Sequence, residues 1–170
     1  ALEGEQLLTK AIKLSEKARK QLNEIQGIFV PGPEMIGKEG CQSYDPTKII
    51  INIRELGLSG FEVENILRYD YRIQIELSDL YNILALITIG DSEKSIDILV
   101  SAIKDMAKKY KRKKLIQISA ELPDSQELVV SPRFAFYSQK RKVNLEDSEG
   151  EISAEMLMAY PPGIPIICPG

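Results

Sequence analysis

Residues 45–110 constrain the fold most, because their apolar spacing switches between the period of strands and the period of helices. The segment Lys48–Arg54 (KIIINIR) is short and β-branched, which predicts a strand. The segment Tyr71–Leu77 alternates apolar and polar residues and predicts a second strand. Ile83–Ile89 is apolar throughout, as expected for a strand covered on both faces. The short polar break at Ser78–Tyr81 indicates that the second and third strands lie side by side.

Helices are predicted before, between and after these strands. Residues 2–26 form one amphipathic helix. A second helix begins at the capping box Ser59–Glu62, in which the hydroxyl and the carboxylate satisfy free backbone N–H groups. The Gly90-Asp91-Ser92 sequence caps a third, longer helix. The predicted buried positions of the last two helices are Phe61, Val63, Ile66 and Leu67, then Ile96, Leu99, Val100, Ile103, Met106, Ala107 and Tyr110.

These patterns predict an α+β fold, a small sheet with helices packed on it, followed by a smaller α+β region. Residues 27–44 hold four glycines and two prolines and are expected to be an irregular connector. For the later residues the sequence predicts a strand at 115–122, a helix at 133–142 capped by Ser131-Pro132, a strand at 143–145, a strand or helix at 152–160 and an edge strand at 166–168.

The chain contains no histidine, which is the most informative fact in its composition. Serine–histidine and cysteine–histidine catalysis and histidine metal sites are therefore excluded within this chain, and we expect no metal site. The formal net charge of −3 gives no reason to expect nucleic acid or an anionic membrane as a partner. Two cysteines and the absence of a signal-peptide pattern favour a cytoplasmic location.

Glu76 and Asp79 are the main site candidates, because they bracket the turn between two predicted strands. Alternatively, Glu76 is a solvent-facing carboxylate beside Arg72. Arg133, after a capped helix start, is an anion ligand or a surface charge. Tyr160 is a packing or a site residue, and Cys168 is expected to be an inert, buried thiol.

The run Lys108–Lys114 holds six basic residues in seven. It is either an anion or nucleic-acid patch or the solvated end of a helix, where cations suit the helix dipole. We favour the second interpretation, because the run is isolated in an acidic chain.

Several stretches resemble bacterial Orn/Lys/Arg decarboxylases, most of all the Gram-positive type of arginine decarboxylase. The stretches occur in the same order over nearly the whole chain: ALEGEQLLTKAI, YDPTKIIINIRELGLSGFEVENIL, IQIELSDLYNILALITIGDS, SPRFAF and ISAEMLMAYPPGIPIICPG. The family consists of pyridoxal-phosphate enzymes of fold type I. The LGLSG, IELSDLYN and YPPGIP pieces are its most specific features in this chain.

The resemblance implies that the chain is a C-terminal piece of such an enzyme. Residues 1–26 would be the helix leaving a missing large domain, residues 27–110 the small domain, and residues 111–170 the C-terminal decarboxylase domain. The missing domain would carry the cofactor lysine and all catalytic and cofactor-binding residues, so the piece by itself is expected to be inactive. The resemblance also implies that Glu76, and less directly Asp79, contacts the distal cation of a basic amino acid.

The implied parent decarboxylates arginine, lysine or ornithine in polyamine biosynthesis and is a homodimer or higher oligomer. An alternative is a stand-alone α+β module that binds a small cationic ligand or a protein partner. A third possibility is an anion or nucleic-acid binder acting through Lys108–Lys114.

Overall fold

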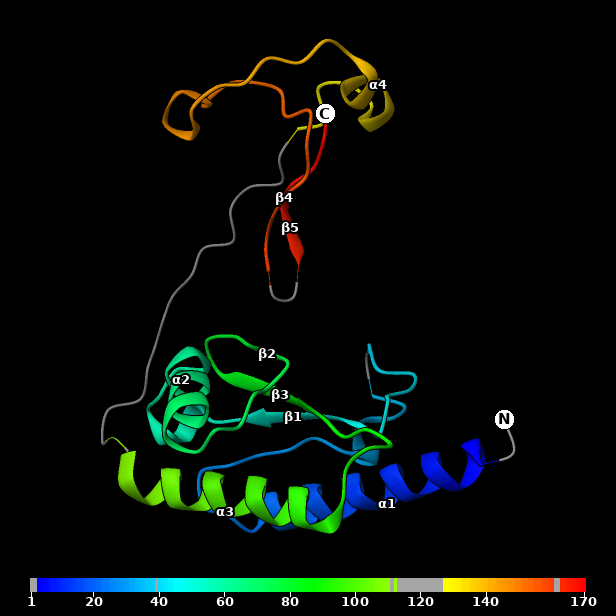
Figure 1. The fold of residues 1–170 in the computed structure, drawn as a ribbon, viewed down its shortest axis with the longest axis vertical. Helices are drawn as coiled ribbons and strands as arrows, with labels where there is room; N and C mark the ends of the chain where they lie inside the picture. Colours follow the sequence, from blue (N-terminus) through cyan, green and yellow to red (C-terminus); the bar gives the residue numbers. More distant parts are fainter. Residues whose placement is uncertain (1–2, 39, 111, 113–126, 161–162) are drawn as a thin grey trace. The chain divides into compact units, whose positions relative to one another are not determined.

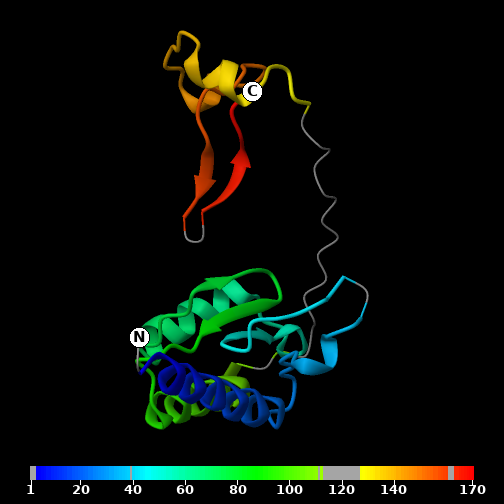
Figure 2. The same ribbon diagram turned by 90° about the vertical axis from the view of Figure 1, so that its right-hand side faces the viewer.

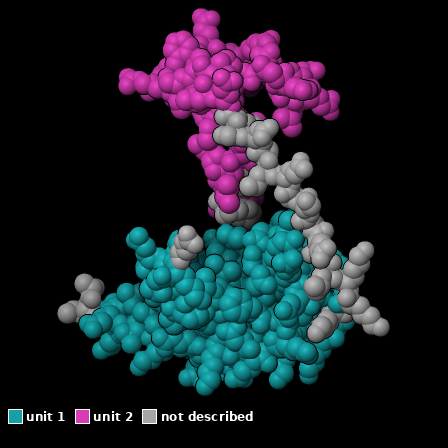
Figure 3. Space-filling view, turned by 180° about the vertical axis from the view of Figure 1, so that it is seen from behind, with its two compact units in different colours: residues 1–118 teal, residues 119–170 magenta. Residues whose placement is uncertain are grey.

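The computed structural model describes residues 3–38, 40–110, 112, 127–160 and 163–170. The chain divides into two compact units, Ala1–Ile118 and Ser119–Gly170, which are coloured separately in Figure 3.

The first unit is built on a three-stranded antiparallel sheet with the strand order β1-β3-β2. Its strands are β1 (Lys48–Asn52), β2 (Leu77–Ser78) and β3 (Asn82–Leu86). Ile51 pairs with Ile83, which places both side chains on the buried face of the sheet. The strand predicted over residues 48–54 is confirmed but is shorter, because the 3₁₀ helix Arg54–Leu56 follows it.

Two long helices, α1 (Gly4–Asn23) and α3 (Glu93–Tyr110), run side by side along one face of this sheet (Figures 1 and 2). Both were predicted, and most positions of their apolar stripes are buried or half-buried, but the predicted buried positions Leu8 of α1 and Tyr110 of α3 are 55% and 37% exposed. Ser92 caps α3 by accepting the Ser95 N–H at 3.4 Å. A shared core of leucine, isoleucine and alanine side chains therefore holds the two helices on the sheet.

Helix α2 (Gly60–Asp70) begins at the predicted capping box. Glu62 N–H donates to Ser59 Oγ at 3.2 Å, and Ser59 N–H donates to Glu62 Oε2 at 2.9 Å. Val63 and Leu67 are buried, but Phe61 is 51% exposed, which contradicts its predicted place in the core. The buried residues of α2 are Gly60, Val63 and Leu67, so Phe61 lies outside the buried side of the helix.

The strand predicted over Tyr71–Leu77 is wrong, since only Leu77–Ser78 pairs as a strand. Arg72 has a φ of 57°, in the left-handed region, and Ile73 N–H donates to Leu67 O at 2.9 Å. Residues 71–73 therefore terminate α2, and the chain becomes extended only after them. The predicted alternation of side chains survives, because Ile75 is buried while Arg72 and Glu76 are exposed.

The strand predicted over Ile83–Ile89 is confirmed in part, as β3 ends at Leu86. It is not covered on both faces by the residues that the structure describes. Ile83 is buried, whereas Leu86 is 38% exposed and Ile50, on the same face as Leu86, is 46% exposed. One face of the sheet carries the core, and the other presents apolar side chains to solvent.

Among the described residues of the second unit, the regular elements are a short α-helix, a 3₁₀ helix and a two-stranded hairpin. Helix α4 (Pro132–Tyr137) begins at the predicted Ser131 cap but is shorter than the predicted 133–142. Strands β4 (Leu157–Ala159) and β5 (Ile164–Ile167) pair in antiparallel fashion, which resolves the strand-or-helix alternative at 152–160 and confirms the final strand. The strand predicted at 143–145 is wrong, because Leu145–Asp147 is a 3₁₀ helix. The strand predicted at 115–122 lies outside the described residues.

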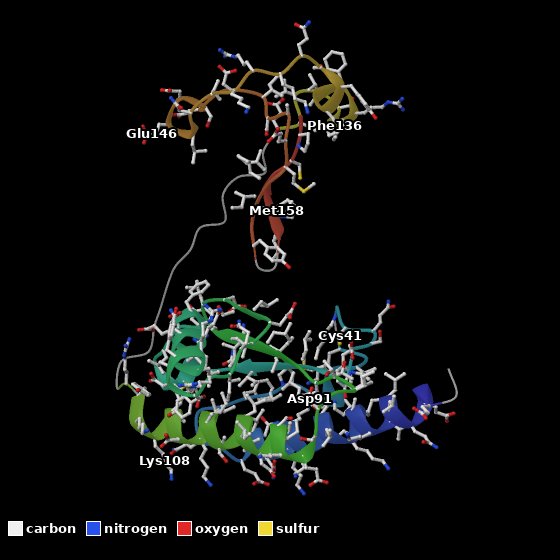
Figure 4. The ribbon with its side chains drawn as sticks, viewed as in Figure 1. Cys41, Asp91, Lys108, Phe136, Glu146 and Met158 are labelled. Atoms are coloured by element: carbon white, nitrogen blue, oxygen red, sulfur yellow. The ribbon has the colours of Figure 1, made fainter. Side chains whose placement is uncertain are left out.

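Apolar side chains of the second unit are mostly exposed. Among its described residues only Ala135 is a buried hydrophobic, while Phe136 and Met158, labelled in Figure 4, are 54% and 46% exposed. Backbone bonds at the last residue hold the unit together, since Gly170 O accepts from Val129 N–H and Val130 N–H. Hydrophobic burial within the unit is therefore small.

Candidate functional site

The turn between β2 and β3 is built by the carboxylate of Asp79. Its Oδ1 accepts the Tyr81 N–H at 2.7 Å and the Asn82 N–H at 2.8 Å, and Asn82 Nδ2 donates to both oxygens at 3.1 Å. An aspartate that bonds the backbone two and three residues on is a common way to fix a tight turn. The Asp79 side chain is thus engaged within its own turn.

Helix α2 approaches this turn at Gly60. The Gly60 N–H donates to Leu80 O at 3.3 Å. A Cβ at residue 60 would lie 2.2 Å from Asp79 O and 2.3 Å from Asn82 O, which no side chain could accommodate. The LGLSG and IELSDLYN motifs therefore meet in space.

Strand β1 supports the same turn from its other side. Asn52 Nδ2 donates to Asn82 Oδ1 at 2.9 Å, and Ile53 N–H donates to Tyr81 O at 2.9 Å. The Arg54 guanidinium lies 5.1 Å from the centre of the Tyr81 ring. The end of the sheet is accordingly a connected network of amide, carboxylate and guanidinium groups.

Glu76 lies just before β2 and differs from Asp79. Its backbone N–H donates to Leu84 O at 2.9 Å, so the main chain is fixed beside β3. Its carboxylate is exposed, and no hydrogen bond or ion pair engages it within the described residues. Glu76 can therefore accept a hydrogen bond from a cation without losing an internal partner.

Side chains of α2 hold the segment that carries Glu76. Arg68 Nε donates to Gln74 Oε1 at 3.0 Å, and Ser78 Oγ donates to Glu64 Oε2 at 2.5 Å. Arg68 also forms an ion pair with Glu64. The residues on both sides of Glu76 are thus anchored, and its carboxylate is presented from a fixed backbone.

Electrostatics at the start of α2 favour an ionised Glu62. The Ser59 backbone N–H, assisted by the Ser59 hydroxyl and by Arg112, lowers the pKa of Glu62 below its ordinary value. The Arg112–Glu62 ion pair measures 2.8 Å. Lys109 likewise pairs with Asp105 at 2.7 Å. Two cations of the basic run are therefore paired, and its members 111, 113 and 114 lie outside the described residues.

The other sequence candidates, Arg133, Tyr160 and Cys168, all belong to the second unit and are exposed. Arg133 is exposed on α4, and Tyr160 is 84% exposed after β4. Cys168 is exposed, so the expectation of a buried thiol is wrong. The short β4–β5 hairpin has no core of its own in which Cys168 could be buried.

Sequence reasoning missed Arg19, which is only 7% exposed on α1. Its guanidinium donates to Pro31 O at 2.8 Å, Pro46 O at 3.3 Å and Lys48 O at 3.4 Å, and it lies 5.4 Å from the centre of the Tyr44 ring. An arginine within the apolar stripe of α1, followed by a connector rich in glycine and proline, was the signal for this role.

No cluster of acidic or cysteine side chains suited to a metal ion is found among the described residues. None of the described helices combines the length and the apolar character needed to cross a bilayer.

Comparison with known proteins identifies the class. Residues 117–170 match the family described as Orn/Lys/Arg decarboxylase, C-terminal domain. Arginine decarboxylases of Bacillus anthracis and Bacillus subtilis (strain 168) are each 44% identical over 172 residues, which is 100% of this chain and 35% of each relative. The arginine decarboxylase of Halalkalibacterium halodurans is 42% identical over the same shares. The chain thus spans about a third of the length of these relatives.

Solved structures agree with the fold class. The structure described as E. coli constitutive lysine decarboxylase matches with a TM-score of 0.68 at 19% identity, over 100% of this chain and 34% of that one. The Francisella novicida lysine decarboxylase matches with a TM-score of 0.67 at 22% identity over the same shares. The predicted α+β fold and the predicted resemblance are both confirmed. The chain is thus similar over its whole length to about a third of each arginine decarboxylase, and its residues 117–170 to the C-terminal domain of the Orn/Lys/Arg decarboxylase family.

Proposed function

We propose that this chain is the C-terminal part of a pyridoxal-phosphate-dependent decarboxylase of a basic amino acid, with arginine as the first candidate substrate. The relatives at 42–44% identity are named arginine decarboxylases, whereas the lysine decarboxylase structures that match the chain are 19–22% identical, which supports arginine over lysine. In this proposal the chain supplies a substrate contact to a site completed by protein outside it.

The free carboxylate of Glu76 is the observation that carries the proposal. A substrate with a distal guanidinium or ammonium needs an acceptor, and Glu76 is an exposed carboxylate on an anchored segment, with no bonding partner among the described residues. A hydrogen bond to a charged group contributes about 1.5–3 kcal/mol. Asp79 is the weaker candidate, because its oxygens already accept from Tyr81 and Asn82.

The described side chains around Glu76 do not fit the cofactor itself. Attachment of pyridoxal phosphate requires a lysine amine, and the group then serves as an electron sink when carbon dioxide leaves. The network at the turn consists of Asn52, Arg54, Asp79, Tyr81 and Asn82, bonded to one another. We place the cofactor on the part of the parent that precedes this chain.

The exposed face of the sheet is consistent with further protein packing on this unit. Ile50 and Leu86 are 46% and 38% exposed on the face that α1 and α3 leave open. We propose the division into a connecting helix (1–26), a small domain (27–110) and a C-terminal domain (111–170). We further propose a homo-oligomeric, cytoplasmic parent that acts in polyamine biosynthesis.

The Glu76→Gln variant of the full-length parent tests the proposed role. We expect KM for arginine to rise by about tenfold, the loss expected for one charge-assisted hydrogen bond, with little change in cofactor affinity. The matched control is Glu55→Gln, an exposed carboxylate of the same unit. Unchanged kinetics in Glu76→Gln would remove Glu76 from the site.

The isolated chain gives a second test. We expect it neither to bind pyridoxal phosphate nor to release carbon dioxide from arginine, lysine or ornithine, as measured by cofactor absorbance and by trapped gas. Either activity in the isolated chain would contradict the proposal that the cofactor lies outside it.

A stand-alone module for a cationic ligand is the second candidate, and the same unbonded Glu76 favours it. Calorimetry of the isolated chain with arginine and agmatine separates the two. A complete module should bind one of them saturably, whereas a chain that holds part of a pocket should bind neither.

A further inference from the structure

Four side chains form a continuous series of hydrogen bonds around the segment that carries Glu76. Arg68 Nε donates to Gln74 Oε1 at 3.0 Å, and another nitrogen of the same guanidinium donates to Glu64 Oε1 at 2.5 Å. The second oxygen of Glu64 accepts from Ser78 Oγ at 2.5 Å. Gln74 and Ser78 lie two residues before and two residues after Glu76. The series therefore begins and ends on this segment and passes through α2 between the two ends.

Glu64 stands at the centre of this series. Both of its carboxylate oxygens accept a hydrogen bond, one from its own helix and one from β2, and its side chain is 18% exposed. Arg68, one turn further along α2, is 38% exposed. Hydrogen bonds to an ionised acceptor are roughly twice as strong as those between neutral groups. Glu64 is therefore the group that ties α2 to the strand following Glu76.

The backbone on the other side of Glu76 is held by β3 and by the core. The Glu76 N–H donates to Leu84 O at 2.9 Å, and Ile75 is 4% exposed. Gln74 Nε2 also donates to Ile75 O at 2.9 Å. A binding group keeps its productive position within about 0.5 Å only when its neighbours are fixed by such supporting bonds. The support of Glu76 thus depends on β3 on one side and on Glu64 on the other.

We propose that Glu64 is a positioning residue for substrate binding. It holds Ser78 directly and Gln74 through Arg68, so that the Glu76 carboxylate meets the distal cation of the basic amino acid. This inference rests on the function proposed above for Glu76. Glu64 itself acts without touching the substrate, because both of its oxygens are engaged by protein donors.

The test measures KM for arginine in the full-length parent. Ser78→Ala and Glu64→Ala each break the bond between α2 and β2. We expect each to raise KM about fivefold, less than the loss expected for the Glu76 contact itself, with little change in kcat or in cofactor affinity. Ser78→Ala removes only a hydroxyl and carries the test if Glu64→Ala fails to fold.

Glu64→Gln separates the bonds of Glu64 from its charge. The amide oxygen can accept from Arg68, and the amide nitrogen can donate to the Ser78 hydroxyl, which also accepts hydrogen bonds. We therefore expect KM in Glu64→Gln to stay near the wild-type value. An equal rise in Glu64→Gln and Glu64→Ala would assign the effect to the charge of Glu64 and would overturn a positioning role.

Tyr71→Phe is the matched control. Tyr71 Oη donates to Asp105 Oδ2 at 2.7 Å, so this variant also removes one hydroxyl that is bonded to a carboxylate on a helix. That bond joins the end of α2 to α3 and does not reach residues 74–78. We expect a loss of stability similar to that of Ser78→Ala, with KM unchanged. An equal rise in KM in both variants would reduce the Glu64 bonds to a merely structural role.

A double variant shows whether Glu64 acts through Glu76. In the Glu76→Ala background, Glu64→Ala should raise KM no further, because the contact that it positions is already lost. Effects that multiply in the double variant, or an unchanged KM in both Ser78→Ala and Glu64→Ala, would overturn the inference while leaving Glu76 in the site. An unchanged KM in Glu76→Gln would instead overturn the proposed function, and this inference with it.

Discussion

Gly60, the first residue of α2, packs against the carbonyl oxygen of Asp79 so closely that a Cβ at residue 60 would lie 2.2 Å from that oxygen. This contact joins the start of a helix to a turn nineteen residues later in the chain. Because the same turn follows the segment that carries Glu76, the position of the candidate site depends on a residue with no side chain.

Gly60→Ala is expected to destabilise the chain by about 3 kcal/mol, at the upper end of the cost of overpacking, because the clashing atoms belong to the backbone and cannot rotate away. Urea unfolding measures the change. Gly4→Ala is the matched control, since Gly4 also begins a helix and an added Cβ would meet no atom within 4 Å. Equal effects of the two substitutions would contradict the close approach.

Asp79→Ala is expected to cost about 1–3 kcal/mol of stability, because the Tyr81 and Asn82 N–H groups lose their acceptor. Asp79→Asn retains an oxygen acceptor and should cost less. Glu76→Ala is the control, and its effect should stay within about 0.5 kcal/mol, as for other unbonded surface positions. Thermal or urea unfolding measures the stability of each variant. A larger loss of stability in Glu76→Ala than in Asp79→Ala would contradict the assignment of Asp79 to the turn.

The ionised Glu62 should make stability depend on pH. Its pKa in the folded chain is lowered, first by the Ser59 N–H, so its contribution is present above the unfolded value of about 4.3 and is lost as the pH falls through the lower, folded pKa. We expect the unfolding free energies of the wild type and Glu62→Gln to differ most near neutral pH and to converge in acid. Asn65→Ala, exposed and uncharged on the same helix, should differ from the wild type by a constant amount. If the difference in unfolding free energy between the wild type and Glu62→Gln increased in acid, the proposed mechanism would be contradicted.

Arg19→Met should destabilise the connector after α1 by about 2–3 kcal/mol, because three backbone carbonyls lose a charged donor. The local effect can be measured as faster trypsin cleavage at Lys38, which is exposed in that connector. Lys20→Met, at an exposed neighbouring position, is the control. Equal cleavage rates for the two variants would show that Arg19 does not organise the connector.

Much of the fold could be predicted from local patterns in the sequence. The stripes of α1 and α3, the Ser59–Glu62 box and the β-branched run of β1 each depend on residues a few positions apart. The same local motifs carried the family resemblance, which the comparisons confirm. These features were predictable because the residues that form each of them are neighbours in the chain.

The tertiary structure decided which polar side chains have hydrogen-bond partners within the described residues and which do not. Glu76 and Asp79 are three residues apart and both acidic, yet within the described part of the chain only the Asp79 carboxylate accepts hydrogen bonds, in the turn that packs on Gly60. The sequence of α1 did not indicate a role for Arg19, because its acceptors, Pro31 O and Pro46 O, belong to the connector that follows the helix. Spacing in the sequence determined the helices and the first strand. The partners of the buried and turn-forming polar groups were decided by chain segments that only folding brings together, since a hydrogen bond requires contact within about 3 Å.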